Sequence, residues 1–91
     1  MITQEKIDKL FTILRIVHTS HWKPPKAEDV NKEIEKTGAY IFRAGKEQWV
    51  AEVKLTETSI TYEINPELPA RMKKKAEEMK KKFEQLIRGL L

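Results

Sequence analysis

The chain has 91 residues, with 18 Lys and Arg against 14 Asp and Glu, and 40% of its residues are hydrophobic. This length predicts a single domain with one core. The absence of cysteine excludes disulfide scaffolds, thiolate metal sites and cysteine nucleophiles. No apolar run approaches the roughly 18 residues of a membrane-spanning helix, and the first residues lack the layout of a signal peptide. We therefore expect a cytoplasmic protein with no membrane partner.

The first segment with helical periodicity runs over residues 3–19, with Thr3 as the expected N-cap. Its apolar residues recur three and four apart over more than one narrow face: Ile7, Leu10, Phe11, Ile13, Leu14, Ile16 and Val17. So wide an apolar surface needs cover from more than one side. This predicts a homo-oligomer in which a second copy packs against the helix through Ile13 and Ile16.

Two consecutive prolines place a loop at residues 20–25, and a second helix is expected over 26–37, ended by Gly38. The second helix is charged except for a thin apolar stripe, which is typical of a helix on the outside of a fold. Trp22 lies in the loop beside Lys23. A tryptophan beside basic residues can stack on bases or anchor a partner, although more often it packs its loop against the core.

Between residues 39 and 65 the apolar period changes to two, which predicts a three-stranded antiparallel meander. A two-residue turn at Glu57 and Thr58 would pair Leu55 with Ile60, Val53 with Tyr62, and Ala51 with Ile64. A four-residue connection over 45–48 would pair Ala44 with Trp49, Phe42 with Ala51, and Tyr40 with Val53. Both pairings place the apolar side chains on one face of the sheet. A slip of one residue would move the apolar side chains of one strand to the other face.

A last helix is predicted over residues 68–91. Its apolar positions alternate four and three apart: Met72, Ala76, Met79, Phe83, Leu86 and Leu90. Two or three heptads are too few for a coiled coil, and a paired copy would set lysine against lysine, so this seam is expected to pack on the sheet. The predicted fold is α+β in the order α-α-β-β-β-α, with two N-terminal helices, the meander and a long C-terminal helix on the sheet.

The last helix carries the positive charge of the chain. Residues 71–91 hold eight Lys and Arg against three Glu, a net charge of +5, whereas residues 1–70 hold ten against eleven, a net charge of −1. The candidate phosphate-binding residues are Arg71, Lys73, Lys74, Lys75, Lys80, Lys81 and Lys82. Such a run is often only a solvated face held by Lys–Glu pairs four apart, each worth about 0.2–0.5 kcal/mol. The alternative is a lysine stripe that neutralises phosphates or an acidic partner.

Two further pairs could carry chemistry. His18 and His21 are three residues apart and could approach one metal ion, but two nitrogens do not make a site. Glu52 and Glu63 would face each other across two strands, with Arg43 diagonally placed to neutralise them. No nucleophile or glycine-rich turn accompanies these pairs. We therefore expect no metal, no cofactor, no small-molecule substrate and no enzymatic activity.

The order of elements resembles two known families. Residues 26–91 follow the α-β-β-β-α order of double-stranded-RNA-binding domains, with an alternating strand at 49–53 and lysines at 73–75 where that family binds phosphate. The loop at 45–48 departs from that family because it lacks the Gly-Pro and His. The run at 64–68 that leads into the last helix resembles YbaB-type nucleoid proteins, which are dimeric DNA binders. Both resemblances imply nucleic-acid binding.

The leading hypothesis is a small non-catalytic protein that binds the phosphate backbone of nucleic acid through the last helix. Bidentate arginine contacts to guanine are not expected, because the chain has only four arginines. The alternative is a homo-oligomeric adaptor or accessory protein, of viral or mobile-element origin, with the first helix at the interface. The partner contacts expected for these alternatives are Trp22, Ile13 and Ile16.

Overall fold

The computed structural model describes residues 1–45 and 48–90. Within these residues the chain forms three helices and three strands: α1 (Gln4–His18), α2 (Ala27–Thr37), β1 (Tyr40–Ala44), β2 (Ala51–Leu55), β3 (Ile60–Ile64) and α3 (Ala70–Ile87). The strands form one antiparallel sheet in the order β1-β2-β3. The predicted α+β class and the α-α-β-β-β-α order are confirmed.

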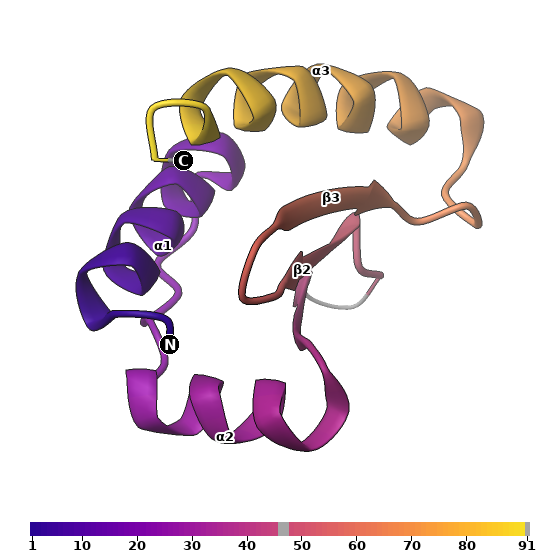
Figure 1. The fold of residues 1–91 in the computed structure, drawn as a ribbon. Coiled ribbons are helices and arrows are strands. Elements are labelled where there is room, and N and C mark those ends of the chain that lie inside the picture. Colours follow the sequence, from indigo (N-terminus) through magenta and orange to yellow (C-terminus); the bar gives the residue numbers. More distant parts are fainter. Residues whose placement is uncertain (46–47, 91) are drawn as a thin grey trace.

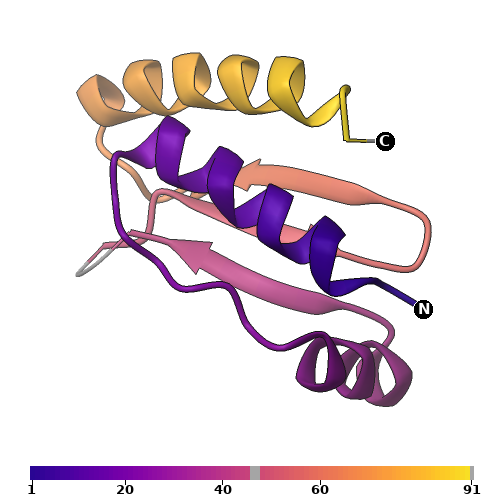
Figure 2. The same cartoon turned by 90° about the vertical axis from the view of Figure 1, so that its left-hand side faces the viewer.

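The three helices curve around one face of the sheet (Figure 1). In Figure 2, α1 crosses in front of the strands, α3 runs along the β3 side and α2 lies on the β1 side. The predicted contact between the C-terminal helix and the sheet is therefore present, through β3. The helix over the middle of the sheet, however, is α1.

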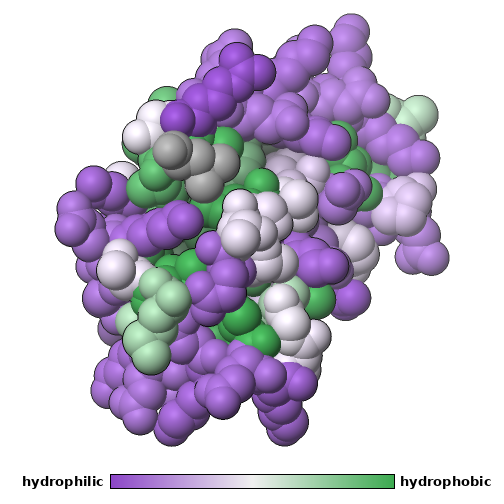
Figure 3. All heavy atoms as spheres, in the orientation of Figure 1, coloured by the Kyte–Doolittle hydropathy of each residue, from purple (hydrophilic) through white to green (hydrophobic). Residues whose placement is uncertain are grey.

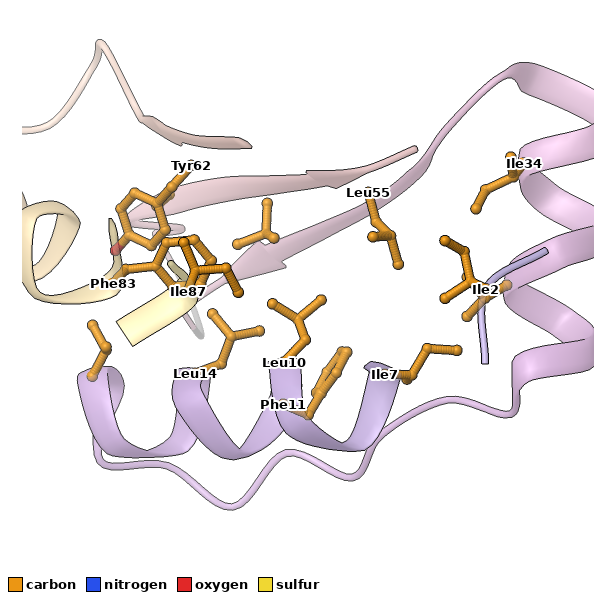
Figure 4. Packing of buried hydrophobic residues seen from close by; sticks show 14 residues of the cluster. Ile2, Ile7, Leu10, Phe11, Leu14, Ile34, Leu55, Tyr62, Phe83 and Ile87 are labelled. Carbon is orange, nitrogen blue, oxygen red and sulfur yellow. The ribbon is translucent and has the colours of Figure 1, made fainter. Parts of the chain in front are cut away.

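The apolar surface of α1 is mostly covered within the chain. Thr3 caps the helix by accepting the backbone N–H of Lys6 at 3.2 Å, as predicted. Five residues of the helix are buried: Ile7, Leu10, Phe11, Leu14 and Val17. In Figure 4 the side chains of Ile7, Leu10, Phe11 and Leu14 point toward the other residues of the core cluster on the sheet and on α3. What remains outside is Ile13, which is half-buried, and Ile16, which is 49% exposed.

The second helix is held by short polar contacts at Asn31 and at its C-terminal end. The Asn31 amide accepts the backbone N–H of Ile2 at 2.9 Å and donates to the backbone oxygens of Ile2 and Ala27. Gly38 ends the helix with φ 93°, and its N–H donates to the oxygen of Ile34 at 2.7 Å. The helix therefore ends at Gly38 as predicted, because glycine adopts this positive φ without strain.

One of the two strand pairings has the predicted register. The β2–β3 pairing around the turn at Glu57 and Thr58 is confirmed. The β1–β2 pairing is shifted by two, with Tyr40 opposite Leu55, Phe42 opposite Val53, and Ala44 opposite Ala51. The connection ends later than predicted because the Val50 N–H donates to the Ala44 oxygen at 2.7 Å before the strand begins. Residues 46 and 47 of the predicted connection lie outside the described residues.

Asn65 turns the chain from β3 toward α3. This buried side chain donates to the Trp49 oxygen at 2.9 Å and accepts the backbone N–H of Glu67 at 3.0 Å. The helix α3 then runs over Ala70–Ile87 rather than the predicted 68–91; Leu91 lies outside the described residues.

The buried residues of α3 are Ala76, Phe83 and Ile87. The predicted seam is therefore wrong at its end, where Leu86 is 38% exposed.

Candidate nucleic-acid interface

Five of the seven predicted phosphate-binding residues form one exposed stripe on α3. They are Arg71, Lys74, Lys75, Lys81 and Lys82, and all five are exposed. Positions three and four apart share a helix face, so this stripe lies opposite the buried side of Ala76 and Phe83. Hydrophilic side chains cover α3 along the top of the molecule (Figure 3). From residue 71 to residue 82 the stripe is about 16 Å long.

The other two predicted residues lie on a second row. Lys73 and Lys80 are spaced with Glu77 and Glu84 at intervals of three and four, so these four side chains share a helix face. Lys73 is exposed, whereas Lys80 is half-buried. Positive and negative charges alternate along this row. The concentrated charge of α3 therefore belongs to the five-residue stripe, whose helix face carries a single glutamate, Glu78.

In the part of the chain that the structure describes, the lysines of α3 form no ion pair with the glutamates of the same helix. The ion pairs found there join Met1 to Glu57, Lys9 to Glu5, Lys32 to Glu28, and Arg43 to Glu52. The Lys–Glu pairs that the spacing allowed within α3 are not among the contacts shorter than 4.0 Å.

The N-terminus of α3 is electrostatically unusual. Pro69 stands at the N-cap and makes no side-chain hydrogen bond to the helix, and the first turn contains no acidic residue. Instead, Arg71 and Lys73 lie in the first turn, and Lys74 follows directly after it. The helix dipole favours anions at this end, and each charge near it is worth about 0.3–1 kcal/mol. The arrangement is unfavourable for the isolated helix and favourable for a bound anion.

A second cluster lies where α1 ends. Trp22 is half-buried, with its ring 5.1 Å from that of Phe42 and 5.4 Å from that of His18. The Nε2 atom of His18 is 2.9 Å from the Tyr62 hydroxyl. Burial lowers the pKa of His18 and raises the pKa of Tyr62 to about 12, so both groups are neutral at neutral pH. Trp22 therefore packs its loop against the core, and part of it also lines a surface hollow.

The predicted partner contacts Ile13 and Ile16 lie beside a groove between α1 and the end of α3. The groove has a volume of about 350 Å³ and is lined by Lys9, Thr12, Ile13, Leu86, Gly89 and Leu90. Ile16 does not line this groove; together with Thr12 it lines a neighbouring depression. The exposed side chains of Leu86 and Ile16 thus line two neighbouring depressions that share Thr12.

The acidic pair on the sheet is a surface cluster. Glu52 and Glu63 are directly opposite each other, as predicted. The prediction that Arg43 lies diagonally is wrong: Arg43 is opposite Glu52 and binds it at 3.2 Å, while its guanidinium stacks on Trp49 at 4.8 Å. The two-residue shift of β1 explains this. Among the described residues, no group of three or more His, Cys, Asp or Glu is arranged to hold a metal ion.

Sequence reasoning missed the partners of Trp22 around the hollow. Ser20 and Met79 line it together with Trp22, and they come from a loop and from α3. The link between His18 and Tyr62 spans 44 residues. Only the position of Trp22 outside any periodic element pointed to this region.

The chain matches no protein family, no curated protein and no solved structure. The resemblances to two nucleic-acid-binding families thus remain resemblances in element order. In the described part of the chain, no helix combines the length and the apolar character needed to cross a bilayer.

Proposed function

We propose that this protein is a non-catalytic, cytoplasmic nucleic-acid-binding protein that contacts the phosphate backbone through α3. The observation that carries the proposal is the exposed stripe of Arg71, Lys74, Lys75, Lys81 and Lys82, which has no ion-pair partner among the described residues. One strand of a duplex presents a phosphate about every 3.4 Å along its axis, so a stripe of about 16 Å faces four or five phosphates.

The first turn of α3 supports the same proposal. Cations at Arg71, Lys73 and Lys74 oppose the helix dipole, and the N-cap offers no side-chain acceptor. A sequence that breaks a local stability rule usually does so at a functional position. A phosphate at this end would neutralise the cations and would also be favoured by the helix dipole.

The test is the salt dependence of binding to oligonucleotides of mixed sequence. A variant with Lys74, Lys75, Lys81 and Lys82 all changed to Gln is expected to bind much more weakly. It should also reduce the slope of log affinity against log salt by about 3, because each lost phosphate contact removes about 0.7–0.9.

The matched control changes Lys26, Lys32, Lys36 and Lys54 to Gln. It takes the net charge from +4 to zero, as the test variant does, but leaves α3 intact. The control is expected to keep most of the affinity and the slope. Equal losses in the two variants would mean that only net charge matters, and an unchanged test variant would refute the proposal.

A second candidate function is supported by the groove between α1 and α3. We propose that two copies associate through Ile13, Ile16 and Leu86, which would remove the exposed apolar surface of Ile16 and Leu86 from water. Light scattering should then show a dimer that Ile16→Glu dissociates. Ile41→Glu is the matched control, because Ile41 is also about half exposed, at 51%, and lies in β1. A monomeric parent would refute this candidate.

A further inference from the structure

A surface hollow of about 570 Å³ lies where the end of α1, the following loop and α3 meet. Its volume is within the 300–1,000 Å³ typical of small-ligand sites. The residues that matter for its chemistry are His18, Ser20, His21, Trp22, Val50 and Met79. We call it the Trp22 hollow.

The Trp22 hollow combines apolar walls with a few polar atoms. Trp22, Val50 and Met79 supply the apolar surface. The Ser20 Oγ is buried and has no hydrogen-bond partner among the described residues. Ser20 lines the hollow, but because its Oγ is closed off from solvent, this oxygen would reach a ligand only after the side chain rotates. Nε2 of His18 forms a hydrogen bond with the Tyr62 hydroxyl. In neutral His18 the other ring nitrogen, Nδ1, is a donor if Nε2 accepts this bond and an acceptor if Nε2 donates it.

This chemistry suits a flat heteroaromatic ring. Such a ring stacks on tryptophan and offers donors and acceptors at its edge. Charged ligands suit it less well, because burial lowers the pKa of His18 and keeps that side chain neutral, and none of the described residues that line the hollow carries a carboxylate. A nucleobase has the required flat shape and polar edge.

The hollow is next to the basic stripe. Met79 in its wall lies four residues after Lys75 and three residues before Lys82, so the three side chains share one side of α3. Both lysines are exposed. A base in the hollow would therefore have two cations close to its own backbone phosphates.

We propose that the Trp22 hollow receives an unpaired base of single-stranded nucleic acid, stacked on Trp22, while Lys75 and Lys82 hold the neighbouring phosphates. This inference rests on the proposed function of α3 and makes it more specific. The bases of a duplex are stacked inside the helix and cannot enter the hollow. Single strands should therefore bind more tightly than a duplex of the same length.

The first experiment uses the Trp49→Phe protein, in which Trp22 is the only tryptophan. A 12-nucleotide single strand, of DNA or of RNA, is expected to quench Trp22 emission, and a 12-base-pair duplex is expected to bind without quenching it. Salt-dependent binding of the single strand without quenching would overturn the hollow proposal and leave the function of α3 intact. Failure of both nucleic acids to bind would overturn both proposals.

Mononucleotides distinguish the source of the base. A mononucleotide should quench only at concentrations far above those of the 12-mer, because it lacks the additional phosphates that α3 would bind. Equal quenching by mononucleotide and 12-mer, at equal concentrations of base, would overturn the assignment to a strand in favour of a free nucleotide.

The second experiment removes the stacking surface. Trp22→Leu is expected to weaken single-strand binding about 5- to 150-fold, the loss typical of one stacked base, and to change duplex binding less than twofold. Trp49→Leu is the matched control, because Trp49 stacks with Arg43 and does not line the hollow. Equal weakening in the two variants would overturn the proposal. Circular dichroism checks that Trp22→Leu folds, and the quenching experiment decides if it does not.

Discussion

The rotation of α3 about its own axis determines which cations face solvent, and two neighbouring residues report this rotation. Ile87 is 6% exposed and belongs to the core, whereas Leu86 is 38% exposed at the groove with α1. Truncating a buried isoleucine to alanine costs about 2–5 kcal/mol. We expect Ile87→Ala to cost about 2–3 kcal/mol, because Ile87 ends the helix and the backbone there can adjust.

The same truncation at Leu86 should cost about 1 kcal/mol or less. Much of its side chain stays in water in the folded protein, and the open groove would leave no closed cavity. Alanine favours the helix by a few tenths of a kcal/mol at either position, so the difference between the variants reflects packing.

Urea denaturation followed by circular dichroism measures both free energies of unfolding. The two free energies should differ by about 1–2 kcal/mol, with the same dependence on urea concentration in both variants. In thermal unfolding, each kcal/mol corresponds to about 4–8 °C in Tm. A cost for Leu86→Ala equal to or above that of Ile87→Ala would place Leu86 in the core. Lys75 and Lys82 would then turn toward α1, and both the stripe and the Trp22 hollow as described would be refuted.

Three further predictions concern the scaffold. Burial lowers the pKa of His18, so the imidazole binds a proton more readily in the unfolded chain than in the folded one. The stability that neutral His18 contributes is complete above pH about 6.5 and decreases as the pH falls. The free energy of unfolding then drops by at most about 1.4 kcal/mol per pH unit. Urea denaturation from pH 8 to pH 5 should show a flatter profile for His18→Gln than for the parent. Asn31→Ala should cost about 1–3 kcal/mol in the same assay, because it leaves the half-buried backbone groups of Ile2 without partners. Gly38→Ala should cost about 1 kcal/mol in thermal unfolding through its positive φ alone, since nothing lies within 4 Å of the added methyl group.

Local sequence signals predicted the parts of the fold that local physics determines. Thr3 and Gly38 mark helix ends because a hydroxyl cap and a positive φ are properties of single residues. The β2–β3 register followed from a two-residue turn at Glu57 and Thr58, which leaves little freedom between the strands.

The parts that could not be predicted depend on distant contacts. A shift of two residues in β1 keeps every side chain on its face, so the hydrophobic pattern cannot distinguish Ala44 opposite Ala51 from Ala44 opposite Trp49. Similarly, Leu86 and Ile87 are both apolar, and only the position of α1 decides which is buried. The Trp22 hollow needs three separate segments, so no spacing in the sequence indicates it.

The two proposed functions share α3, and this makes their salt responses opposite. Lys82 lies four residues before Leu86 on the same side of α3, and Lys9 lines the groove. A dimer formed through the groove would therefore bring cations of two copies together, and their repulsion would oppose association at low salt. Added salt, or a bound oligonucleotide, should strengthen the dimer by screening these cations.

Nucleic-acid binding itself should weaken as salt increases, because the released counterions then return to a more concentrated solution. Light scattering and oligonucleotide binding, measured over the same salt series, thus separate the two proposals. A dimer that dissociates as salt rises would be held by polar contacts, and the apolar surface of Ile13, Ile16 and Leu86 could not be its interface.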